Sequence, residues 1–320
     1  MRKNLLSARM SLVALFLVVT ALATAGSISS AGRAGSGAPQ AITVEKTVYA
    51  VGRAPDGIAF DGANIWVANR RNDTVTKLRA SDGANLGAFA TGAGPSRIAY
   101  DGANIWVTNF FDKSVTKLRA SDGVKIGTFP VGDSPSGLAF DGTSIWVANR
   151  KSGNVTRLRA SNGANLGAIA AGTNPVALVY DGANIWVANH GGDVTKLRAS
   201  DGVKLGTYAA GKGPSDIAFD GANIWVTNFY GGNVKKLRAS DGANLGMVSV
   251  GDGPARVLYV KGYILVANYG SDSISQIAPN TGQVVKTFAV GRSPTDALYD
   301  GSNIWVTNAS AGTISKITAP

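Results

Sequence analysis

The stretch DGANIWVTNF, residues 101–110, decides the fold because nearly the same ten letters return along the chain. Its tryptophan recurs every 40 residues, or 39 in one interval, at Trp66, Trp106, Trp146, Trp186, Trp225 and Trp305. The last interval is 80 residues, and Leu265 stands at its middle in the segment GYILVANYG. The chain therefore contains seven copies of a unit of about 40 residues, a length typical of repeat architectures.

Each unit contains four short runs rich in β-forming residues. In residues 95–132 they read SRIAY, NIWVTN, SVTKLRA and KIGTFPV, and turn letters such as DG separate them. A proline with a glycine three residues before it marks each junction, at Pro55, Pro95, Pro135, Pro175, Pro214, Pro254 and Pro294. The pattern predicts an all-β fold, a seven-bladed β-propeller of four-stranded antiparallel blades.

The two ends of the repeat array complement each other. The last repeat stops at TISKITAP, residues 313–320, which corresponds to a third strand. The segment ITVEKTVYAVGRAP at 42–55 matches GQVVKTFAVGRSP at 282–294, a fourth strand with its junction. We therefore expect the N-terminal strand to complete the seventh blade and close the ring, because an open array would expose strand edges.

The first 41 residues differ in kind from the repeats. Arg2, Lys3 and Arg9 precede the apolar run SLVALFLVVTALA, and Ala23-Thr24-Ala25 fits a cleavage site, which predicts a signal peptide over residues 1–25. The alternative, a membrane anchor, needs about 20 apolar residues. Residues 26–41 favour a flexible linker and 42–320 the propeller. We expect a secreted, periplasmic or cell-surface protein with no transmembrane segment after signal removal. The absence of cysteine excludes disulfides and thiolate chemistry.

The motif that closes the second strand carries a resemblance. WVTN begins at Trp106, Trp225 and Trp305, and WVAN begins at Trp66, Trp146 and Trp186. These motifs resemble the YVTN-repeat β-propeller family of exported and cell-surface proteins. The resemblance implies a seven-bladed propeller outside the cytoplasm and leaves its chemistry open. The chain is also similar to the virginiamycin B lyases, propeller enzymes that open a macrocyclic lactone with a His, a Glu and a magnesium ion.

Residues shared by the repeats are assigned structural roles. Six of seven repeats carry the tryptophan, which favours packing between blades over a platform for a ligand. The asparagine that ends each motif is expected to bond the backbone of the following turn. These asparagines are Asn69, Asn109, Asn149, Asn189, Asn228, Asn268 and Asn308.

Residues that differ between the repeats are the candidates for function. Strand direction alternates, so the loops from second to third strand and the links between repeats lie on one face, here called the variable face. The remaining loops, which repeat DGAN and SDG turns, lie on the opposite, uniform face. The candidate ligand-binding residues of the variable face are Arg53, Arg70, Arg71, Arg97, Phe110, Phe111, Arg150, Lys151, His190, Phe229, Tyr230 and Tyr269.

This mixture of aromatic and basic residues could stack against sugars or other rings and pair with acidic groups. The alternative is an ordinary solvated loop face whose charges pair among themselves, as Asp216, Arg256 and Asp296 on consecutive blades could do. The links also carry Asp133, Lys212, Asp252 and Arg292.

The net charge of +11 comes mainly from the third strand of each repeat. Its TKLRA pattern supplies Lys77, Arg79, Lys117, Arg119, Arg157, Arg159, Lys196, Arg198, Lys236 and Arg238. We expect a belt around several blades, and no nucleic-acid binding, because a patch with interleaved aromatics is missing. Such a belt could hold the protein against anionic envelope polymers.

Two classes of function remain open. The first is an exported binding or scaffold protein, a monomer with no cofactor or metal, whose partner is a protein, a glycan or an anionic envelope polymer. The second is a lyase or hydrolase whose base is His190 or an Asp of the variable face, assisted by magnesium. The chain has one His and one Glu (Glu45, in the closing strand), and no GxSxG, calcium-loop or zinc pattern. We therefore favour the first class.

Overall fold

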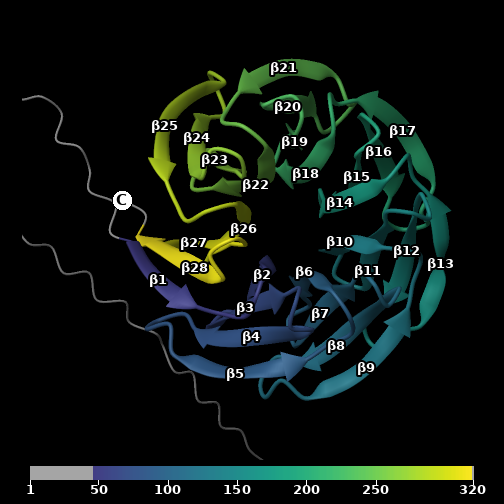
Figure 1. Ribbon diagram of the computed structural model, residues 1–320. Helices are drawn as coiled ribbons and strands as arrows, with labels where there is room; N and C mark the ends of the chain where they lie inside the picture. Colours follow the sequence, from purple (N-terminus) through teal and green to yellow (C-terminus); the bar gives the residue numbers. More distant parts are fainter. Residues whose placement is uncertain (1–45, 319–320) are drawn as a thin grey trace, which may run out of the picture. The chain divides into compact units, whose positions relative to one another are not determined.

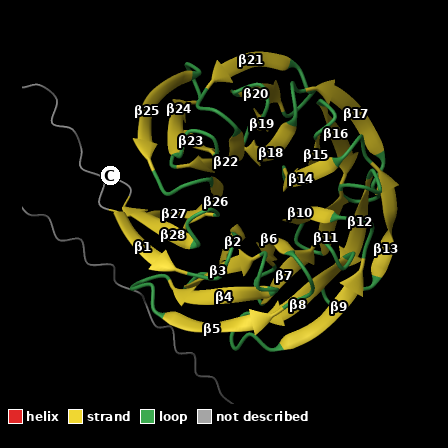
Figure 2. Ribbon diagram, viewed as in Figure 1, coloured by secondary structure: helices red, strands yellow, loops and turns green. Residues whose placement is uncertain are grey.

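The computed structural model describes residues 46–318, which form a ring of seven four-stranded antiparallel sheets (Figure 1). Every regular element in this range is a strand (Figure 2), so the range holds no helix that could cross a membrane. The predicted all-β propeller is confirmed. The predicted signal peptide and linker, residues 1–41, lie outside the described residues.

The strands follow one another from the axis outward in each blade. Blade 1 is β2 (Pro55–Phe60), β3 (Asn64–Asn69), β4 (Thr74–Arg79) and β5 (Asn85–Ala90). Blade 2 is β6 (Pro95–Tyr100), β7 (Asn104–Asn109), β8 (Ser114–Arg119) and β9 (Lys125–Pro130). Blade 3 is β10 (Pro135–Phe140), β11 (Ser144–Asn149), β12 (Asn154–Arg159) and β13 (Asn165–Ala170). Blade 4 is β14 (Pro175–Tyr180), β15 (Asn184–Asn189), β16 (Asp193–Arg198) and β17 (Lys204–Ala209).

The remaining blades keep this order. Blade 5 is β18 (Pro214–Phe219), β19 (Asn223–Asn228), β20 (Asn233–Arg238) and β21 (Asn244–Ser249). Blade 6 is β22 (Pro254–Val260), β23 (Tyr263–Asn268), β24 (Ser273–Ala278) and β25 (Gln283–Ala289). Blade 7 is β26 (Pro294–Tyr299), β27 (Asn303–Asn308), β28 (Thr313–Thr318) and β1 (Lys46–Ala50).

The ring closes in blade 7, where the two ends of the chain share one sheet. Strand β1 pairs antiparallel with β28, and Lys46 lies opposite Ile317 while Ala50 lies opposite Thr313. The innermost strands then contact one another in a closed cycle, with β2 between β26 and β6. The expectation that the N-terminal strand completes the last blade is confirmed: β1 is the outermost strand of blade 7, so this blade has four strands like the others.

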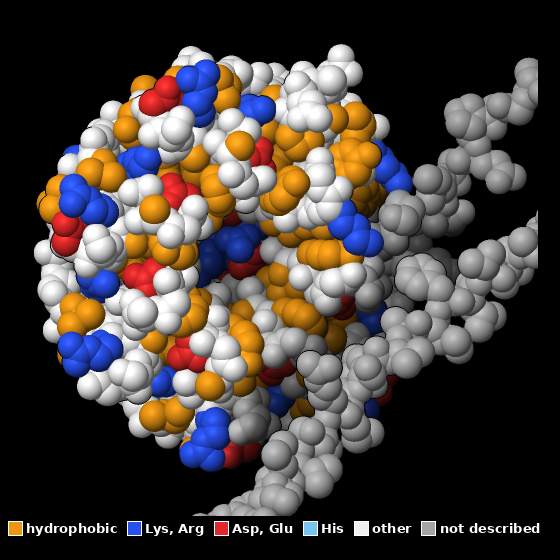
Figure 3. Space-filling view, turned by 180° about the vertical axis from the view of Figure 1, so that it is seen from behind, with side chains coloured by type: hydrophobic (Ala, Val, Ile, Leu, Met, Phe, Trp, Pro, Cys, Tyr) orange, Lys and Arg blue, Asp and Glu red, His pale blue; other side chains and the backbone are white. Residues whose placement is uncertain are grey.

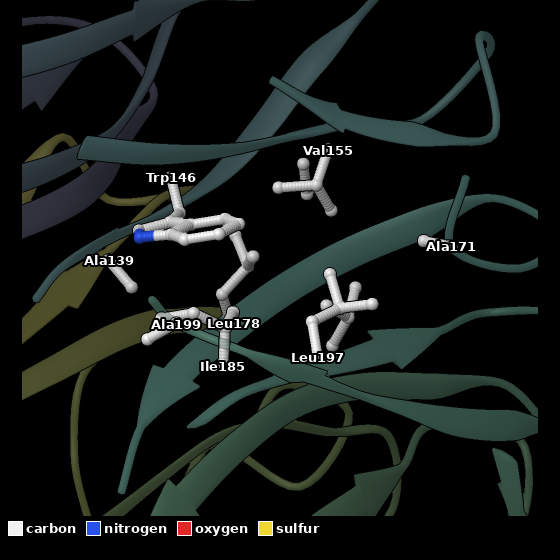
Figure 4. Packing of buried hydrophobic residues seen from close by; sticks show 10 residues of the cluster. Ala139, Trp146, Val155, Ala171, Leu178, Ile185, Leu197 and Ala199 are labelled. Carbon is white, nitrogen blue, oxygen red and sulfur yellow. The ribbon is translucent and has the colours of Figure 1, made fainter. Parts of the chain in front are cut away.

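The core lies between blades rather than within one blade. Trp146 and Val155 of blade 3 pack with Ile185, Val187 and Leu197 of blade 4 (Figure 4). The second strands are apolar on both faces because each face meets a neighbouring sheet. All six tryptophans are fully buried, which confirms that they pack between blades.

Each tryptophan is held by an acid from its own blade and a cation that reaches the next blade. In blade 2, Trp106 Nε1 donates to Asp101 Oδ2 at 2.7 Å. Lys117 Nζ lies 4.7 Å from the Trp106 ring centroid and donates to the Ala160 carbonyl of blade 3 at 2.7 Å. We call this arrangement the Asp–Trp–cation unit.

The unit recurs in every blade that carries a tryptophan. The other members are Asp61 with Trp66 and Lys77, Asp141 with Trp146 and Arg157, Asp181 with Trp186 and Lys196, Asp220 with Trp225 and Lys236, and Asp300 with Trp305 and Lys316. In blade 6 all three positions change together, to Val260, Leu265 and Gln276. The three residues therefore behave as one structural device.

These contacts correct the expectation of a ten-cation belt. The first cation of each TKLRA motif is turned inward between blades, and Lys77 and Lys117 are buried. Burial lowers the pKa of Lys117, while Asp101 opposes that shift. The second cation stays exposed, and four of these arginines pair with an acid of the following turn: Arg79 with Asp82, Arg119 with Asp122, Arg198 with Asp201 and Arg238 with Asp241.

The motif asparagine also differs from its expectation. Asn109 Nδ2 donates to Ser114 Oγ and Thr116 Oγ1 of the third strand, and Asn109 Oδ1 accepts from Gly92 N of the preceding link. Its side chain does not bond the following turn. The asparagine is buried where the link crosses the blade, so its amide finds partners in the adjacent strand and link.

Candidate functional site: the variable face and the channel

On the variable face, each loop after the second strand is tied to the link that enters the same blade. In blade 2, Phe110 N donates to Gly94 O at 2.9 Å and Phe111 N donates to Ala93 O at 3.1 Å. Blade 1 repeats this pairing between Arg71 N and Arg53 O at 3.2 Å. The pairing of loop and link thus recurs between blades, although the blade 4 loop between Asn189 and Asp193 is one residue shorter, and the side chains differ most from one loop to another.

The structure brings three of the predicted site residues together at blades 1 and 2. The Arg70 guanidinium lies 4.6 Å from the Phe110 ring centroid and 5.6 Å from that of Phe111. The two rings meet edge to face at 5.3 Å, and Arg70 also pairs with Asp56 at 3.2 Å. Phe111 is 65% exposed, so an aromatic face stands in solvent on a fixed support.

Four more predicted residues gather at blades 4 to 6. Tyr230 lies edge-on to both Phe229 and His190, with each pair of ring centroids 5.4 Å apart. Phe229 packs against Tyr269 of the next blade at 6.1 Å. Tyr230 is 70% exposed. The arrangement offers a second exposed aromatic group, and its inner members hold the outer one in place.

His190 is engaged by the fold. Its Nδ1 lies 3.0 Å from the Pro214 carbonyl oxygen, which fixes a proton on Nδ1, and its ring packs on Tyr230. Within residues 46–318, no three His, Asp or Glu side chains form a group that could hold a metal ion. Glu45, the chain's single glutamate, lies outside this range.

The channel along the ring axis holds the predicted residue Arg97. Its guanidinium pairs with Asp56 at 2.9 Å and with Asp296 of blade 7 at 3.5 Å. Burial disfavours the charged guanidinium, but Asp296 and Asp56 outweigh this effect and raise the Arg97 pKa. Arg97 therefore lies beneath the loops rather than on their rim.

A second arginine bridges the next acids around the channel. Arg256 pairs with Asp216 at 3.0 Å, and its Nε lies 2.6 Å from Asp296 Oδ1 without the alignment of a hydrogen bond. Burial raises the pKa of Asp296, the two arginines oppose this shift, and the Asp216 charge adds to it. Asp216 also accepts from Val257 N of the following blade at 2.8 Å. The paired-charge alternative is therefore the observed one for these residues.

The paired charges line a channel cavity of about 280 Å³. Basic and acidic side chains are visible inside the central hollow in Figure 3. Asp56, which belongs to this network, was missed by sequence reasoning. Its signal was that Asp56 stands where the other repeats carry Ser, Val, Ala or Thr. These charges therefore pair mainly with one another and with the backbone across the inner strands of blades 1, 2, 5, 6 and 7.

One hollow on the variable face lies between blades 6, 7 and 1. We call it the notch; it measures about 600 Å³ and is lined by Arg53, Ala54, Arg71, Tyr269, Ala309, Ser310, Ala311 and Gly312. It joins three predicted residues from two blades, Arg53 and Arg71 of blade 1 and Tyr269 of blade 6. The last predicted residues, Arg150 and Lys151 on blade 3, contact neither the aromatic groups nor the notch through any interaction found in the described range.

Fold and site define a seven-bladed β-propeller with an aromatic and basic loop face. No family model and no curated protein matches the chain. Among solved structures it is similar to a Kuenenia stuttgartiensis hydrazine synthase, with 17% identity, a TM-score of 0.75, and coverage of 89% of this chain and 98% of that one.

Two lyase structures are similar in the same way. For virginiamycin B lyase from Staphylococcus aureus the identity is 14%, the TM-score 0.75, and the coverage 87% of this chain and 100% of that one. For a streptogramin B lyase the identity is 15%, the TM-score 0.74, and the coverage 86% and 97%. At such identities the likeness concerns the fold alone.

Proposed function

We propose that this protein is an exported binding or scaffold propeller of the YVTN-repeat kind, whose variable face contacts a protein, a glycan or an anionic envelope polymer. The carrying observation is the exposure of Phe111 and Tyr230, at 65% and 70%. A loop tied by backbone hydrogen bonds does not need an aromatic side chain, and large exposed rings mark contact surfaces.

The contrast with the uniform face supports this proposal. There the loop residues have structural partners, such as Trp106 for Asp101 and Asp122 for Arg119. On the variable face the outermost rings have only supporting contacts from beneath. Export is supported by the basic and apolar start of the chain, Arg2 to Ala25, and by the WVTN and WVAN repeats.

The lyase alternative is less well supported. It would need a base and a metal site on the variable face, whereas His190 is bonded to a carbonyl and the described range holds no group of three metal-ligating side chains. The likeness to lyase structures lies in the fold, which hosts many functions.

The test is a ligand screen followed by paired variants. The purified protein is scanned by thermal shift against glycans, polyanions and divalent ions, because a ligand that binds the folded state raises the melting temperature. We expect at least one glycan or polyanion to stabilise it. The variant with both Phe111→Ser and Tyr230→Ser should lose most of this binding and keep its melting temperature.

The matched control removes exposed apolar residues from the uniform face. Val124 and Val203 are 49% and 47% exposed in its turns, so Val124→Ser with Val203→Ser removes apolar surface without touching the variable face. This control should bind as the parent does. Binding that survives the aromatic changes and fails in the control would place the contact face on the other side.

A further inference from the structure

The notch exists because blade 7 carries small residues where other blades carry large ones. Its loop begins Ala309-Ser310, whereas blade 2 has Phe110 and Phe111 at the same positions. The floor is held to the neighbouring link, since Val51 N donates to Gly312 O at 3.2 Å. A preformed hollow of about 600 Å³ lies in the size range of small-molecule sites.

Two arginines stand side by side on one wall of the notch. Arg53 and Arg71 occupy the paired link and loop positions of blade 1, and both are exposed. Across residues 46–318, neither guanidinium forms an ion pair with a carboxylate. Like charges at directly opposed positions destabilise a pairing unless an anion lies between them.

The other blades show what these two positions hold when no anion is needed. Blade 3 places the opposite charges Asp133 and Lys151 there, and Asp133 also pairs with Lys113 at 2.7 Å. The remaining pairs are Ala93 with Phe111, Thr173 with Gly191, Lys212 with Tyr230, Asp252 with Gly270 and Arg292 with Ser310. Among the seven described blades, blade 1 is the one with two like charges.

The opposite wall is aromatic. Tyr269 lines the notch, is 38% exposed, and is supported from behind by Phe229 at 6.1 Å. Ser310 on the floor adds a hydroxyl, although it already donates to Ser293 Oγ at 2.8 Å, so it remains an acceptor. An aromatic wall facing a forked basic wall suits a ligand with a ring and a carboxylate.

We propose that the notch binds an acidic sugar residue, with its carboxylate between Arg53 and Arg71 and the apolar face of its ring on Tyr269. This inference rests on the proposed function, because it names the ligand class for the variable face. Free phosphate would leave the aromatic wall unused. A nucleotide would stack its base there, but the notch offers one aromatic face and few groups to read a base edge.

The test measures calorimetric binding of digalacturonate, with digalactose, inorganic phosphate and uridine monophosphate as comparison ligands. We expect binding of digalacturonate alone, weakened by added salt. Arg53→Gln, Arg71→Gln and Tyr269→Ala should each weaken it on the order of tenfold or more. Arg79→Gln and Arg119→Gln, exposed arginines of the uniform face, should leave it unchanged.

Two further variants introduce residues that other blades carry at the equivalent positions, so we expect both variants to fold. Ala309→Phe copies blade 2 and should fill the notch, abolishing binding with no loss of melting temperature. Arg53→Asp copies Asp133 of blade 3, and should abolish binding while the melting temperature stays equal or rises, because a like-charge contact becomes an attractive one.

Several outcomes would overturn the inference. Absence of digalacturonate binding does so, as does equal binding of phosphate or of uridine monophosphate. If digalacturonate binding survives every notch variant but is lost with Phe111→Ser and Tyr230→Ser, the notch is wrong and the proposed function stands. If it is lost only in the uniform-face control, Val124→Ser with Val203→Ser, both proposals fail.

Discussion

The uniform and variable faces are built from the same seven-bladed backbone, yet their side chains differ: those of the uniform face hold the blades together, whereas those of the variable face differ from blade to blade. On the uniform face, Asp101 holds Trp106 and Lys117 fastens the next blade, and this unit occurs in six blades. On the variable face, the loops share backbone hydrogen bonds but carry different side chains, such as Phe111 and Ser310. A position that carries structure repeats, whereas one that is free to carry function varies.

Blade 6 refines this comparison because it departs from the rule on the uniform face. It replaces the acid, the tryptophan and the cation together, by Val260, Leu265 and Gln276. Leu265 still packs in the core, 3% exposed, beside Ile304 and Val306 of blade 7. The uniform face thus tolerates change when the whole unit changes, since no buried partner is then left without its bond.

The largest expected effect comes from breaking one Asp–Trp–cation unit. Trp106→Leu leaves a cavity and removes the indole donor of Asp101, so the free energy of unfolding should fall by about 3 kcal/mol or more. Adding Asp101→Val and Lys117→Gln copies Val260 and Gln276 of blade 6 and should restore about 1 kcal/mol or more through coupling. Urea unfolding measures both. A triple variant as unstable as the sum of its single changes would show that the three residues are independent.

A smaller loss is expected from the turns of the uniform face. Gly123 has φ of 76°, and a β-carbon there would collide with the Phe89 ring of blade 1, whereas Gly102, with φ of 98°, faces open space. Each change to Val costs about 1–3 kcal/mol of backbone strain, because positive φ is unfavourable for a β-branched residue. Gly123→Val should be the less stable in urea, since it adds the collision. Equal urea midpoints for the two variants would mean that the Phe89 side chain moves aside at no cost in stability.

The pH dependence of stability should follow the acids of the uniform face. Burial tends to raise the pKa of Asp101, but hydrogen bonds from Trp106 and the turn backbone outweigh it and lower the pKa. The same direction holds for Asp61, Asp141, Asp181, Asp220 and Asp300.

Because these folded-state pKa values lie below the unfolded value of 3.8, the stabilisation is complete above pH 3.8 and is lost as pH falls through the folded pKa. Asp296 has the opposite sign: its pKa is raised, so its contribution declines as pH rises from 3.8 to the folded value. We expect urea midpoints to fall on acidification below pH 3.8, and to fall less in Asp101→Asn. An unchanged slope in that variant would contradict the assignment.

The smallest effect is expected on the variable face. Phe111→Ala and Tyr230→Ala remove side chains that are 65% and 70% exposed, so each should change the free energy of unfolding by less than about 1 kcal/mol. Thermal and urea unfolding measure this directly. A loss as large as that of Trp106→Leu would make these rings packing residues and would erase the distinction between the two faces.

The repeated sequence predicted much of this fold. The seven blades were predicted from the spacing of the tryptophans. The closing strand was predicted from the match between residues 42–55 and 282–294. Both patterns can be read by comparing repeats within the sequence. For the candidate site, the sequence predicted which face of the propeller carries it but not where on that face the residues meet. Arg53, Arg71 and Tyr269 lie on blades 1 and 6, so only ring closure brings them to one notch.

The tertiary structure alone decided which charges are engaged and which stand open. Lys117 is the first cation of one TKLRA motif and Arg79 is the second cation of another. Lys117 is buried between blades, whereas Arg79 is exposed. Arg97 and Arg53 both lie at or near the links between repeats. Arg97 is paired with acids inside the channel, whereas Arg53 lines the notch. The sequence determined the fold because strand periodicity and turn chemistry act locally. The fate of each charge depends on residues from other blades, which the chain places within reach only after the ring has closed.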